Sequence, residues 1–226
     1  VLDSRAAEVE KMTGTRPLTY NDFRQVLDNK DVQAVIIGAP DHWHAIMMMM
    51  ALDAGKHVYV EKPCSHNMAE NELLVEAQKK YGKVVQMGNQ QRSSEHTIEI
   101  IKEIHNGVIG KPYLAVAFYS NKRGEVQHQQ AAPVPEGLDW DLFQGPAVRR
   151  DYTSETWNYN WHWYGWNYGT AELGNNATHE LDVARWALQV DFPNHVQVDA
   201  AKTAFVDDGW EMYDTMDATF KFDGNK

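Results

Sequence analysis

Polar and charged side chains follow three apolar runs of the chain where each run ends. These polar segments read GAPDHWH after residues 32–37, EKP after residues 57–60 and GNQQR after residues 83–87. Parallel strands present their carboxyl ends at one edge of a sheet, where ligands bind, so we expect the segments to border one crevice. Lys62 precedes Pro63, which steers the lysine toward extended backbone, and a Lys–Pro peptide can also be cis. Spacing alone leaves two interpretations of Lys62 open. Either Pro63 fixes the direction of its amine in the crevice, or the lysine is a solvated residue at the end of a strand.

A second polar group recurs at helical spacing. It consists of Asn175, His179, Asp182 and Trp186. If the segment is helical, these side chains lie at i, i+4, i+7 and i+11 and share one face. Apolar residues occupy the neighbouring face, so the polar row faces either solvent or a cleft. The indole of Trp186 favours the cleft.

A metal-dependent amidohydrolase offers another reading of these residue types. Its inventory would be His42, His44, Lys62, His179 and Asp182. The two histidines enter a predicted helix, where residues two apart point in divergent directions, whereas metal-binding His-x-His pairs use a strand to aim both rings one way. We therefore predict no metal site, and metal analysis of the purified protein would discriminate the two classes.

Composition limits the classes of partner. The chain has 226 residues, 43% of them hydrophobic, and a formal net charge of −11, which suits one large or two small domains. Basic residues do not cluster, so we expect neither nucleic acid nor a membrane surface as a partner. No apolar stretch approaches the ~20 residues of a membrane span. The single cysteine, Cys64, excludes an internal disulfide and a multi-cysteine zinc site.

Residues 1–91 alternate between helical and extended patterns. Apolar periodicity predicts helices over residues 3–14, 19–31, 42–55 and 67–82. Short apolar runs predict strands over residues 32–37, 57–60 and 83–88. Strands separated by helices of this length form a parallel sheet covered on both faces. This part is predicted as a doubly wound α/β domain, in which Asp41 caps the third helix.

The pattern changes after residue 91, and residues 92–226 are predicted as a second, α+β domain. It begins with a helix over residues 96–107, followed by a long loop and an aromatic-rich segment. Residues 195–206 and 215–222 alternate with period two, as antiparallel strands with one solvated face do.

Two segments carry a family resemblance. AGKHVYVEKP, preceded by DVQAVIIGAPDHWHAIMMMMAL, and GTAELGNNATHELDVARWAL resemble the two motifs of the Gfo/Idh/MocA oxidoreductases. That resemblance spans essentially the whole chain. It implies a Rossmann-type domain that binds NAD, with NADP as the alternative, followed by an α+β domain whose large, open, mainly antiparallel sheet carries the substrate site. It further implies a homo-oligomer formed through that sheet. The sequence leaves the location open between the cytoplasm and the periplasm.

The activity implied by the resemblance is oxidation of a hydroxyl of a sugar, polyol or glycoside. Hydride leaves for the nicotinamide while the hydroxyl loses its proton, so a base and a charge stabiliser must converge on one oxygen. His179, with an unperturbed pKa of ~6.5, would be the base. Lys62 would stabilise the developing alkoxide, and Asp182 would orient the imidazole or bind a hydroxyl. Asn175 stands where many members have aspartate, and an amide cannot take a proton.

The resemblance also suggests binding residues. Those expected to border the cofactor are Ala39, Pro40, Asp41, His44, Glu61, Lys62 and Gln90. Those expected to contact a sugar are Trp161, Trp163 and Arg123. Aromatic rings stack on the apolar faces of sugars, although an aromatic cluster is more often core and an arginine in a loop is more often solvated.

One feature of the family pattern is missing from this sequence. No G-x-G-x-x-G motif occurs, so the Gly-rich turn that holds pyrophosphate is absent and we expect the chain to be an internal fragment, cut short in the last sheet as well. Two further functions stay open: a redox-neutral glycosidase of the same family, and a non-catalytic sugar-binding protein. Titration of the complete protein with NAD(H) would separate the last from an enzyme.

Overall fold

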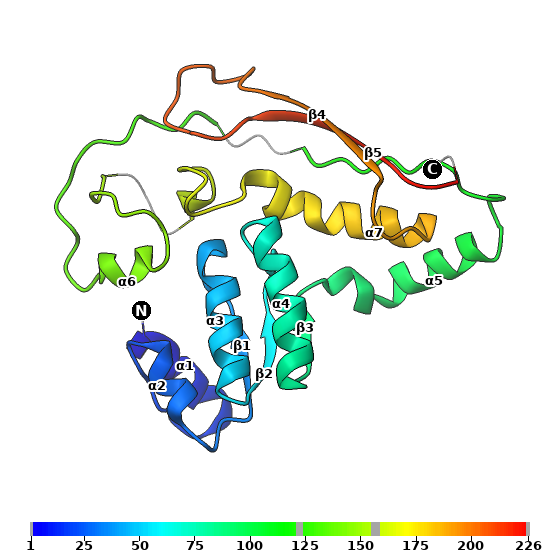
Figure 1. The fold of residues 1–226 in the computed structure, drawn as a ribbon. Helices are drawn as coiled ribbons and strands as arrows, with labels where there is room; N and C mark the ends of the chain where they lie inside the picture. The colour runs from blue at the N-terminus through cyan, green and yellow to red at the C-terminus, as the bar shows by residue number, and fades with distance from the viewer. Residues whose placement is uncertain (1, 121–123, 155–158, 225–226) are drawn as a thin grey trace.

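The computed structural model describes residues 2–120, 124–154 and 159–224 (Figure 1). The α-helices are α1 Leu2–Thr13, α2 Phe23–Asp28, α3 Asp41–Asp53, α4 Met68–Tyr81, α5 Glu95–His105, α6 Trp140–Gln144 and α7 Thr178–Leu188. The strands are β1 Ala34–Ile37, β2 His57–Val60, β3 Val85–Met87, β4 His195–Ala201 and β5 Thr215–Lys221. Short 3₁₀ turns span Gln90–Ser93 (η1) and Asn160–His162 (η2), and a π-helical turn (η3) spans Leu173–Ala177. Within the described residues, no helix has the length and apolar character needed to cross a membrane.

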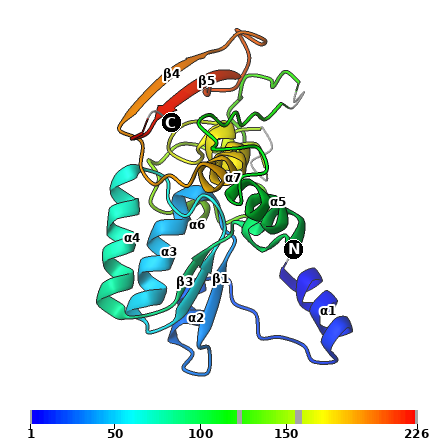
Figure 2. The same cartoon turned by 90° about the vertical axis from the view of Figure 1, so that its right-hand side faces the viewer.

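The first three strands form a parallel sheet in the order β1-β2-β3. Helices α3 and α4 cover one face of it (Figure 2). Side chains from the strands and both helices make the first core: Ile37, Val58 and Val60 from the sheet, Ala45, Met48, Ala51 and Leu52 from α3, Leu74 from α4 and Leu27 from α2. The predicted parallel α/β arrangement is confirmed.

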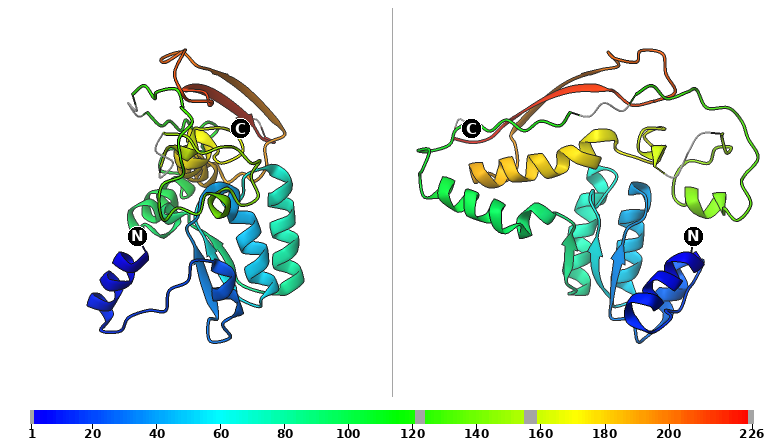
Figure 3. Two further views of the ribbon diagram at one scale, coloured as in Figure 1. Left: turned by 90° about the vertical axis from the view of Figure 1, so that its left-hand side faces the viewer. Right: turned by 180° about the vertical axis from the view of Figure 1, so that it is seen from behind.

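The other face of the parallel sheet corrects the prediction of helices on both sides. Ile36 pairs with Tyr59, and Tyr59 pairs with Gln86, so these three residues lie in one row across that face. Ile36 is 81% exposed, so no described element covers its end of the row. Helix α1 stands away from the sheet (Figures 2 and 3), and Ala6 is its one buried residue. The larger apolar side chains of this helix, Leu2, Val9 and Met12, are exposed.

Local signals at the helix ends hold in most cases. The Asn67 side chain caps α4 by accepting from the backbone N–H of Glu70, and α4 ends at Gly82 in the left-handed conformation. Asp22 caps α2 by accepting from the N–H of Arg24. Asp41, however, does not cap α3, because the helix begins at Asp41 itself and its carboxylate accepts from Thr170 instead.

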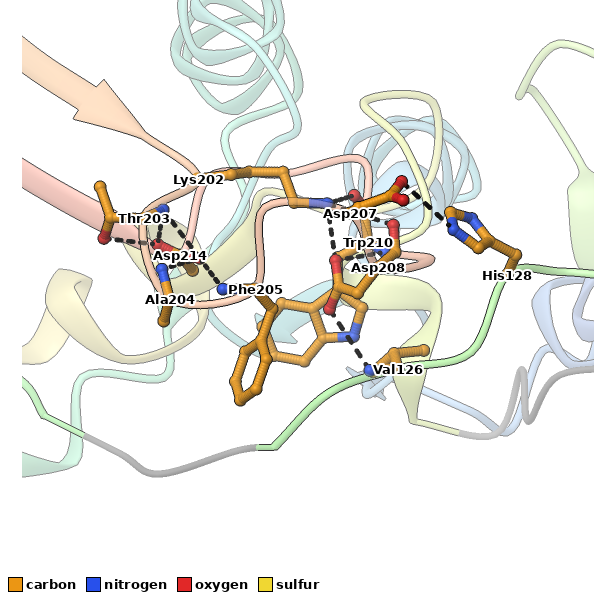
Figure 4. Close-up of polar contacts among 10 residues, drawn as sticks. All are labelled: Val126, His128, Lys202, Thr203, Ala204, Phe205, Asp207, Asp208, Trp210 and Asp214. Atoms are coloured by element: carbon orange, nitrogen blue, oxygen red, sulfur yellow. Dashed lines mark hydrogen bonds and ion pairs between the residues drawn. The ribbon is translucent and has the colours of Figure 1, made fainter.

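The second part of the chain places α7 between the helices of the parallel sheet and an antiparallel hairpin (Figures 1 and 3). Strands β4 and β5 pair from His195↔Lys221 to Ala201↔Thr215. The predicted antiparallel sheet is confirmed, with these two strands as its named members in the described chain. Strand β4 ends at Ala201, short of the predicted residue 206, since the backbone N–H groups of 203–205 donate to the Asp214 carboxylate (Figure 4).

A second core lies under the loops that join α6, η2 and the hairpin. It contains Trp140, Trp161, Trp163, Tyr164, Tyr168, Ala171, Trp210 and Met212. The rings of Trp163 and Trp210 stack with centroids 5.1 Å apart. The loop between β4 and β5 closes this core, because Lys202 Nζ binds Asp208 Oδ1 at 2.6 Å and the backbone oxygen of Trp210 at 2.9 Å (Figure 4).

Candidate active site

Lys62 and Asn175, predicted from two separate motifs, meet in the structure. Lys62 lies just beyond the carboxyl end of β2, and its peptide bond to Pro63 is cis. Its Nζ donates to the backbone oxygen of Asn175 at 2.5 Å and to Asn175 Oδ1 at 2.9 Å. These two bonds join the parallel-sheet part of the chain to the segment that leads into α7.

The π-helical turn explains why the backbone oxygen of Asn175 is available. A π turn shifts hydrogen bonds from i+4 to i+5 and is often found at functional sites, because it frees main-chain groups. The predicted α-helix from residue 175 is thus corrected: regular α-helix begins at Thr178. Asn175 is 7% exposed, and its Oδ1 must face Lys62, since only the amide oxygen can accept. Its Nδ2 has no hydrogen-bond partner among the described residues.

His179 lies on the first turn of α7 and is half-buried. Burial lowers the pKa of this imidazole, and the positive charge of Lys62 lowers it further. The carboxylates of Glu180, Glu61 and Asp182 raise the same pKa by smaller amounts. A histidine with a lowered pKa is neutral at pH 7 and can accept a proton.

Asp182 is paired with a residue that the sequence analysis did not select. Arg92 Nε donates to Asp182 Oδ2 at 2.8 Å, and Arg92 Nη2 donates to Oδ1 at 2.9 Å. The guanidinium also lies 4.5 Å from the centroid of the Trp186 ring. Both carboxylate oxygens thus bind Arg92, whereas Asp182 was expected to orient the imidazole or to bind a substrate hydroxyl. The signal was the GNQQR segment at the third strand end, which was expected to border the crevice but from which only Gln90 was selected.

Glu61 and Gln90 form a polar pair at the ends of β2 and β3. Gln90 Nε2 donates to Glu61 Oε1 at 3.4 Å. A Cβ on Gly88 would lie 2.8 Å from Glu61 Oε2, so the absence of a side chain at this position makes room for the carboxylate. Ala39 and Pro40, at the end of β1, are half-buried. The strand ends therefore carry a carboxylate and an amide next to the Lys62 backbone.

Asp41 and His44 are buried, at 2% and 1% exposure. Asp41 Oδ2 accepts from Thr170 Oγ1 at 2.6 Å, and His44 Nδ1 donates to the backbone oxygen of Pro63 at 2.5 Å. Both side chains therefore bind other segments of the protein, and their contact with a cofactor stays a prediction. The first turn of α3 was expected to border a ligand because it follows a strand end, but sequence gives no measure of how deeply that turn is covered.

The aromatic residues predicted to contact sugar lie in the second core. Trp163 is 1% exposed and stacks on Trp210, and Trp161 stacks on His162 with ring centroids 3.6 Å apart. Their ring faces are covered by protein, so they have the packing role that we set beside the sugar-binding one. Among the described residues of this segment, Trp166 has an exposed indole. Arg123, the third predicted contact, lies outside the described residues.

The described residues contain no cluster of three or more histidine, cysteine or acidic side chains that could hold a metal ion. His42 and His44 both lie in α3, as predicted. His42 contacts the backbone oxygens of Tyr168 and Phe143, at 3.2 and 2.8 Å, and so turns to other partners than His44 does.

The strand ends suit the nicotinamide half of a dinucleotide. The Glu61 carboxylate, for which Gly88 leaves room, can accept from ribose hydroxyls. Beside it, Lys62 and His179 supply an ammonium and a neutral imidazole at one place. These donor and acceptor types fit the group.

Comparison with known proteins gives the same family as the motifs. Residues 1–89 match the family model described as "Oxidoreductase family, NAD-binding Rossmann fold". Residues 95–225 match the model described as "Oxidoreductase family, C-terminal alpha/beta domain". The chain belongs to the Gfo/Idh/MocA family. The resemblance stated from the two motifs is thereby confirmed.

Several curated proteins are similar to this chain in sequence. Inositol 2-dehydrogenase of Salmonella typhimurium is 34% identical over 174 residues, which are 76% of this chain and 40% of that protein. Levoglucosan dehydrogenase of Pseudarthrobacter phenanthrenivorans is 27% identical over 183 residues, 81% of this chain and 40% of that protein. Glycosyl hydrolase family 109 protein 1 of Shewanella is 26% identical over 72% of this chain and 32% of that protein. The chain spans about 40% of the length of the first of these relatives.

Solved structures agree on the Gfo/Idh/MocA fold. A levoglucosan dehydrogenase in complex with NADH and levoglucosan has a TM-score of 0.64 at 22% identity, covering 98% of this chain and 53% of that one. An NAD-binding protein from Listeria innocua has a TM-score of 0.62 at 18% identity, covering 96% of this chain and 51% of that one. At these identities the likeness establishes the fold.

Proposed function

We propose that the protein containing this chain is an NAD-dependent oxidoreductase that acts on a hydroxyl of a sugar or polyol. The observation that carries the proposal is the contact of Lys62 with Asn175 beside His179, an imidazole whose pKa is lowered. An ammonium and a neutral imidazole at one place are the two groups that oxidation of an alcohol requires. The relatives named inositol 2-dehydrogenase and levoglucosan dehydrogenase support the same class of substrate.

The chain's own residues divide the work. His179 accepts the proton of the substrate hydroxyl, because burial and Lys62 keep its imidazole neutral. Lys62 stabilises the alkoxide oxygen that remains. The two oxygen atoms that accept from Lys62 both belong to the uncharged Asn175, so its positive charge is not neutralised there. NAD, when bound, accepts the hydride, and Glu61 with Gln90 would hold its ribose hydroxyls.

Asn175 has a different task from that of an aspartate. Its amide cannot take a proton, whereas its two oxygens fix the direction of the Lys62 ammonium. His179 is therefore the sole base that we assign to the reaction. Asp182, bound by Arg92, is held away from proton transfer and would bind a second substrate hydroxyl only if that pair opened.

A redox-neutral glycosidase is the second candidate, favoured by the likeness to a glycosyl hydrolase family 109 protein. The two reactions differ in their products. The dehydrogenase forms one NADH for each sugar that it oxidises, whereas the glycosidase releases an aglycone and forms no net NADH. Exposed apolar side chains on β4 and β5, among them Val196, Val198 and Met216, support a homo-oligomer formed through that sheet.

The test uses the complete protein with NAD⁺ and a panel of sugars, inositols and aryl glycosides. We expect NADH formation with at least one sugar or polyol. Lys62→Met and His179→Ala should each lower kcat by about two to four decades. Lys79→Met, an exposed lysine on α4, is the matched control and should leave kcat unchanged. Near wild-type turnover by His179→Ala at every pH would rule out the mechanism.

A further inference from the structure

The first turn of α3 holds two segments that come from distant parts of the chain. On one side, Asp41 Oδ2 accepts from the hydroxyl of Thr170, at 2.6 Å. On the other side, His44 Nδ1 donates to the backbone oxygen of Pro63, at 2.5 Å. Both side chains are almost completely buried, and a carboxylate in the first turn of a helix is favoured by the helix dipole.

Gly174 closes a ring between these two segments. A methyl group on Gly174 would collide with Thr170 Oγ1 and would lie 3.1 Å from Cγ of Pro63. The threonine side chain and the proline ring therefore flank the same glycine. The contacts run from Asp41 to Thr170, Gly174, Pro63 and His44, and return to α3.

This ring lies directly next to the Lys62–Asn175 pair along the chain. Lys62 precedes Pro63 and Asn175 follows Gly174, so each partner of the pair is bonded to a member of the ring. We propose that Asp41 and His44 are positioning residues, which set the direction of the Lys62 ammonium through Thr170 and Pro63. The proposal rests on the proposed function, because it gives a purpose to the placement of Lys62.

The arrangement restrains the pair from both sides. Lysine has a long and mobile side chain, and holding its ammonium at one place costs rotamer entropy that anchored neighbours reduce. His44 holds the backbone of Pro63, the residue after Lys62. Asp41 holds Thr170, in the segment that leads into the π turn. Because α3 packs in the first core, both segments are anchored to the same rigid helix.

The pKa of the His179 imidazole depends on the position of the Lys62 ammonium. The groups that act on it are Lys62, Glu180, Glu61 and Asp182, and among them Lys62 lowers its pKa. If Lys62 moves away, the pKa of His179 should rise toward its value in the absence of that charge. Lys62→Met gives the pKa of His179 without that charge. The His179 pKa of each variant of the Asp41–Thr170–Gly174–Pro63–His44 contacts can then be compared with the values in wild type and in Lys62→Met.

The experiment titrates the His179 imidazole by NMR in the full chain, with the resonance assigned through His179→Gln. Thr170→Val removes the hydroxyl and keeps the shape, and Thr170→Ser restores the hydroxyl as its control. His44→Leu removes the donor, and His44→Asn restores an N–H near the position of Nδ1. We expect the first variant of each set to raise the pKa of His179 toward its value in Lys62→Met, and each control to stay near wild type.

Activity of the complete enzyme gives an independent readout. Thr170→Val should lower kcat about tenfold or more with a smaller change in KM, because a misdirected ammonium affects the transition state most. If His44→Leu does not fold, the threonine pair carries the test. The titration needs no substrate, so a protein that oxidises no sugar can still show the pKa changes, and then only the proposed function fails.

Two results would overturn the inference. In the first, Thr170→Val and a folded His44→Leu lower the melting temperature but leave the His179 titration at its wild-type position, so the contacts only hold the fold. In the second, Lys62→Met itself does not move the titration, so Lys62 does not act on His179 at all.

Discussion

Arg92 donates to both carboxylate oxygens of Asp182, at 2.8 and 2.9 Å, and lies over the ring of Trp186. The arginine belongs to η1, at the end of the parallel sheet, and the other two residues belong to α7. The planar guanidinium can bind a carboxylate with two parallel bonds and stack on an indole at the same time, which an ammonium cannot do. This pair is therefore a second link, besides Lys62 and Asn175, between the sheet and α7.

The first prediction concerns the strength of that link. A double-mutant cycle of Arg92→Ala and Asp182→Asn, measured by urea unfolding, should give a coupling energy of about 0.5–1.5 kcal/mol. We expect no more, because the arginine side chain is 43% exposed and solvent screens the pair. The control cycle is Arg149→Ala with Asp141→Asn, whose 3.5 Å contact is more exposed on both sides and should couple near zero. Equal coupling in the two cycles would contradict the prediction.

The second prediction concerns Gly174. Alanine at this position brings its methyl group against Thr170 and Pro63, so Gly174→Ala should destabilise the protein by about 1–3 kcal/mol. Gly38→Ala is the matched control, because nothing lies within 4 Å of a Cβ built there. Chemical unfolding of both variants gives the measurement. If Gly174→Ala is as stable as Gly38→Ala, the close packing of the π turn against Pro63 is not present in solution.

The third prediction concerns the loop between β4 and β5. Lys202 Nζ binds Asp208 Oδ1 at 2.6 Å, and the side chain of Asp208 is 1% exposed (Figure 4). Lys202→Met leaves that carboxylate buried without its cation, which should cost about 3 kcal/mol of unfolding free energy. Lys79→Met is the control, since Glu76, its partner, is 71% exposed and the loss should stay below about 0.5 kcal/mol. A cost for Lys202→Met no larger than for the control would refute the claim.

The fourth prediction is a pH dependence of stability that arises from Asp214. Burial raises the pKa of this carboxyl, but hydrogen bonds from the backbone N–H groups of Thr203, Phe205 and Ala204 and from the Thr215 hydroxyl lower it by more. The folded pKa is therefore below the unfolded value of about 4. Asp214 then contributes its stability above pH ~4, and the contribution is lost as pH falls toward the folded pKa.

Asp214→Asn removes this titration and is the variant to measure. The difference in unfolding free energy between wild type and Asp214→Asn should be largest at neutral pH and should shrink from pH ~4 downward. Asp207→Asn is the control in the same loop, because its carboxylate is 95% exposed and lies 3.5 Å from His128. A difference that stays constant from pH 7 to pH 3 would show that Asp214 does not have a lowered pKa.

Much of the fold follows from the sequence alone, because its causes are local. Apolar runs and helical periodicity predicted the strands and helices of the parallel sheet and its strand ends. Asn67 and Gly82 bound α4 through the capping and left-handed conformations that these residue types favour. The two motifs predicted the family, and they included both Lys62 and Asn175.

Other features depend on contacts between residues far apart in the chain, and only the tertiary structure decided them. Arg92 meets Asp182 across 90 residues, and Asp41 meets Thr170 across 129. The π turn places the backbone oxygen of Asn175 where it accepts from Lys62 Nζ, although the sequence pattern there is that of an ordinary helix. Such choices are made by packing and by the pairing of buried polar groups, which no local pattern records. The same reason explains why sequence reasoning did not foresee the deep burial of Asp41, His44 and Trp163.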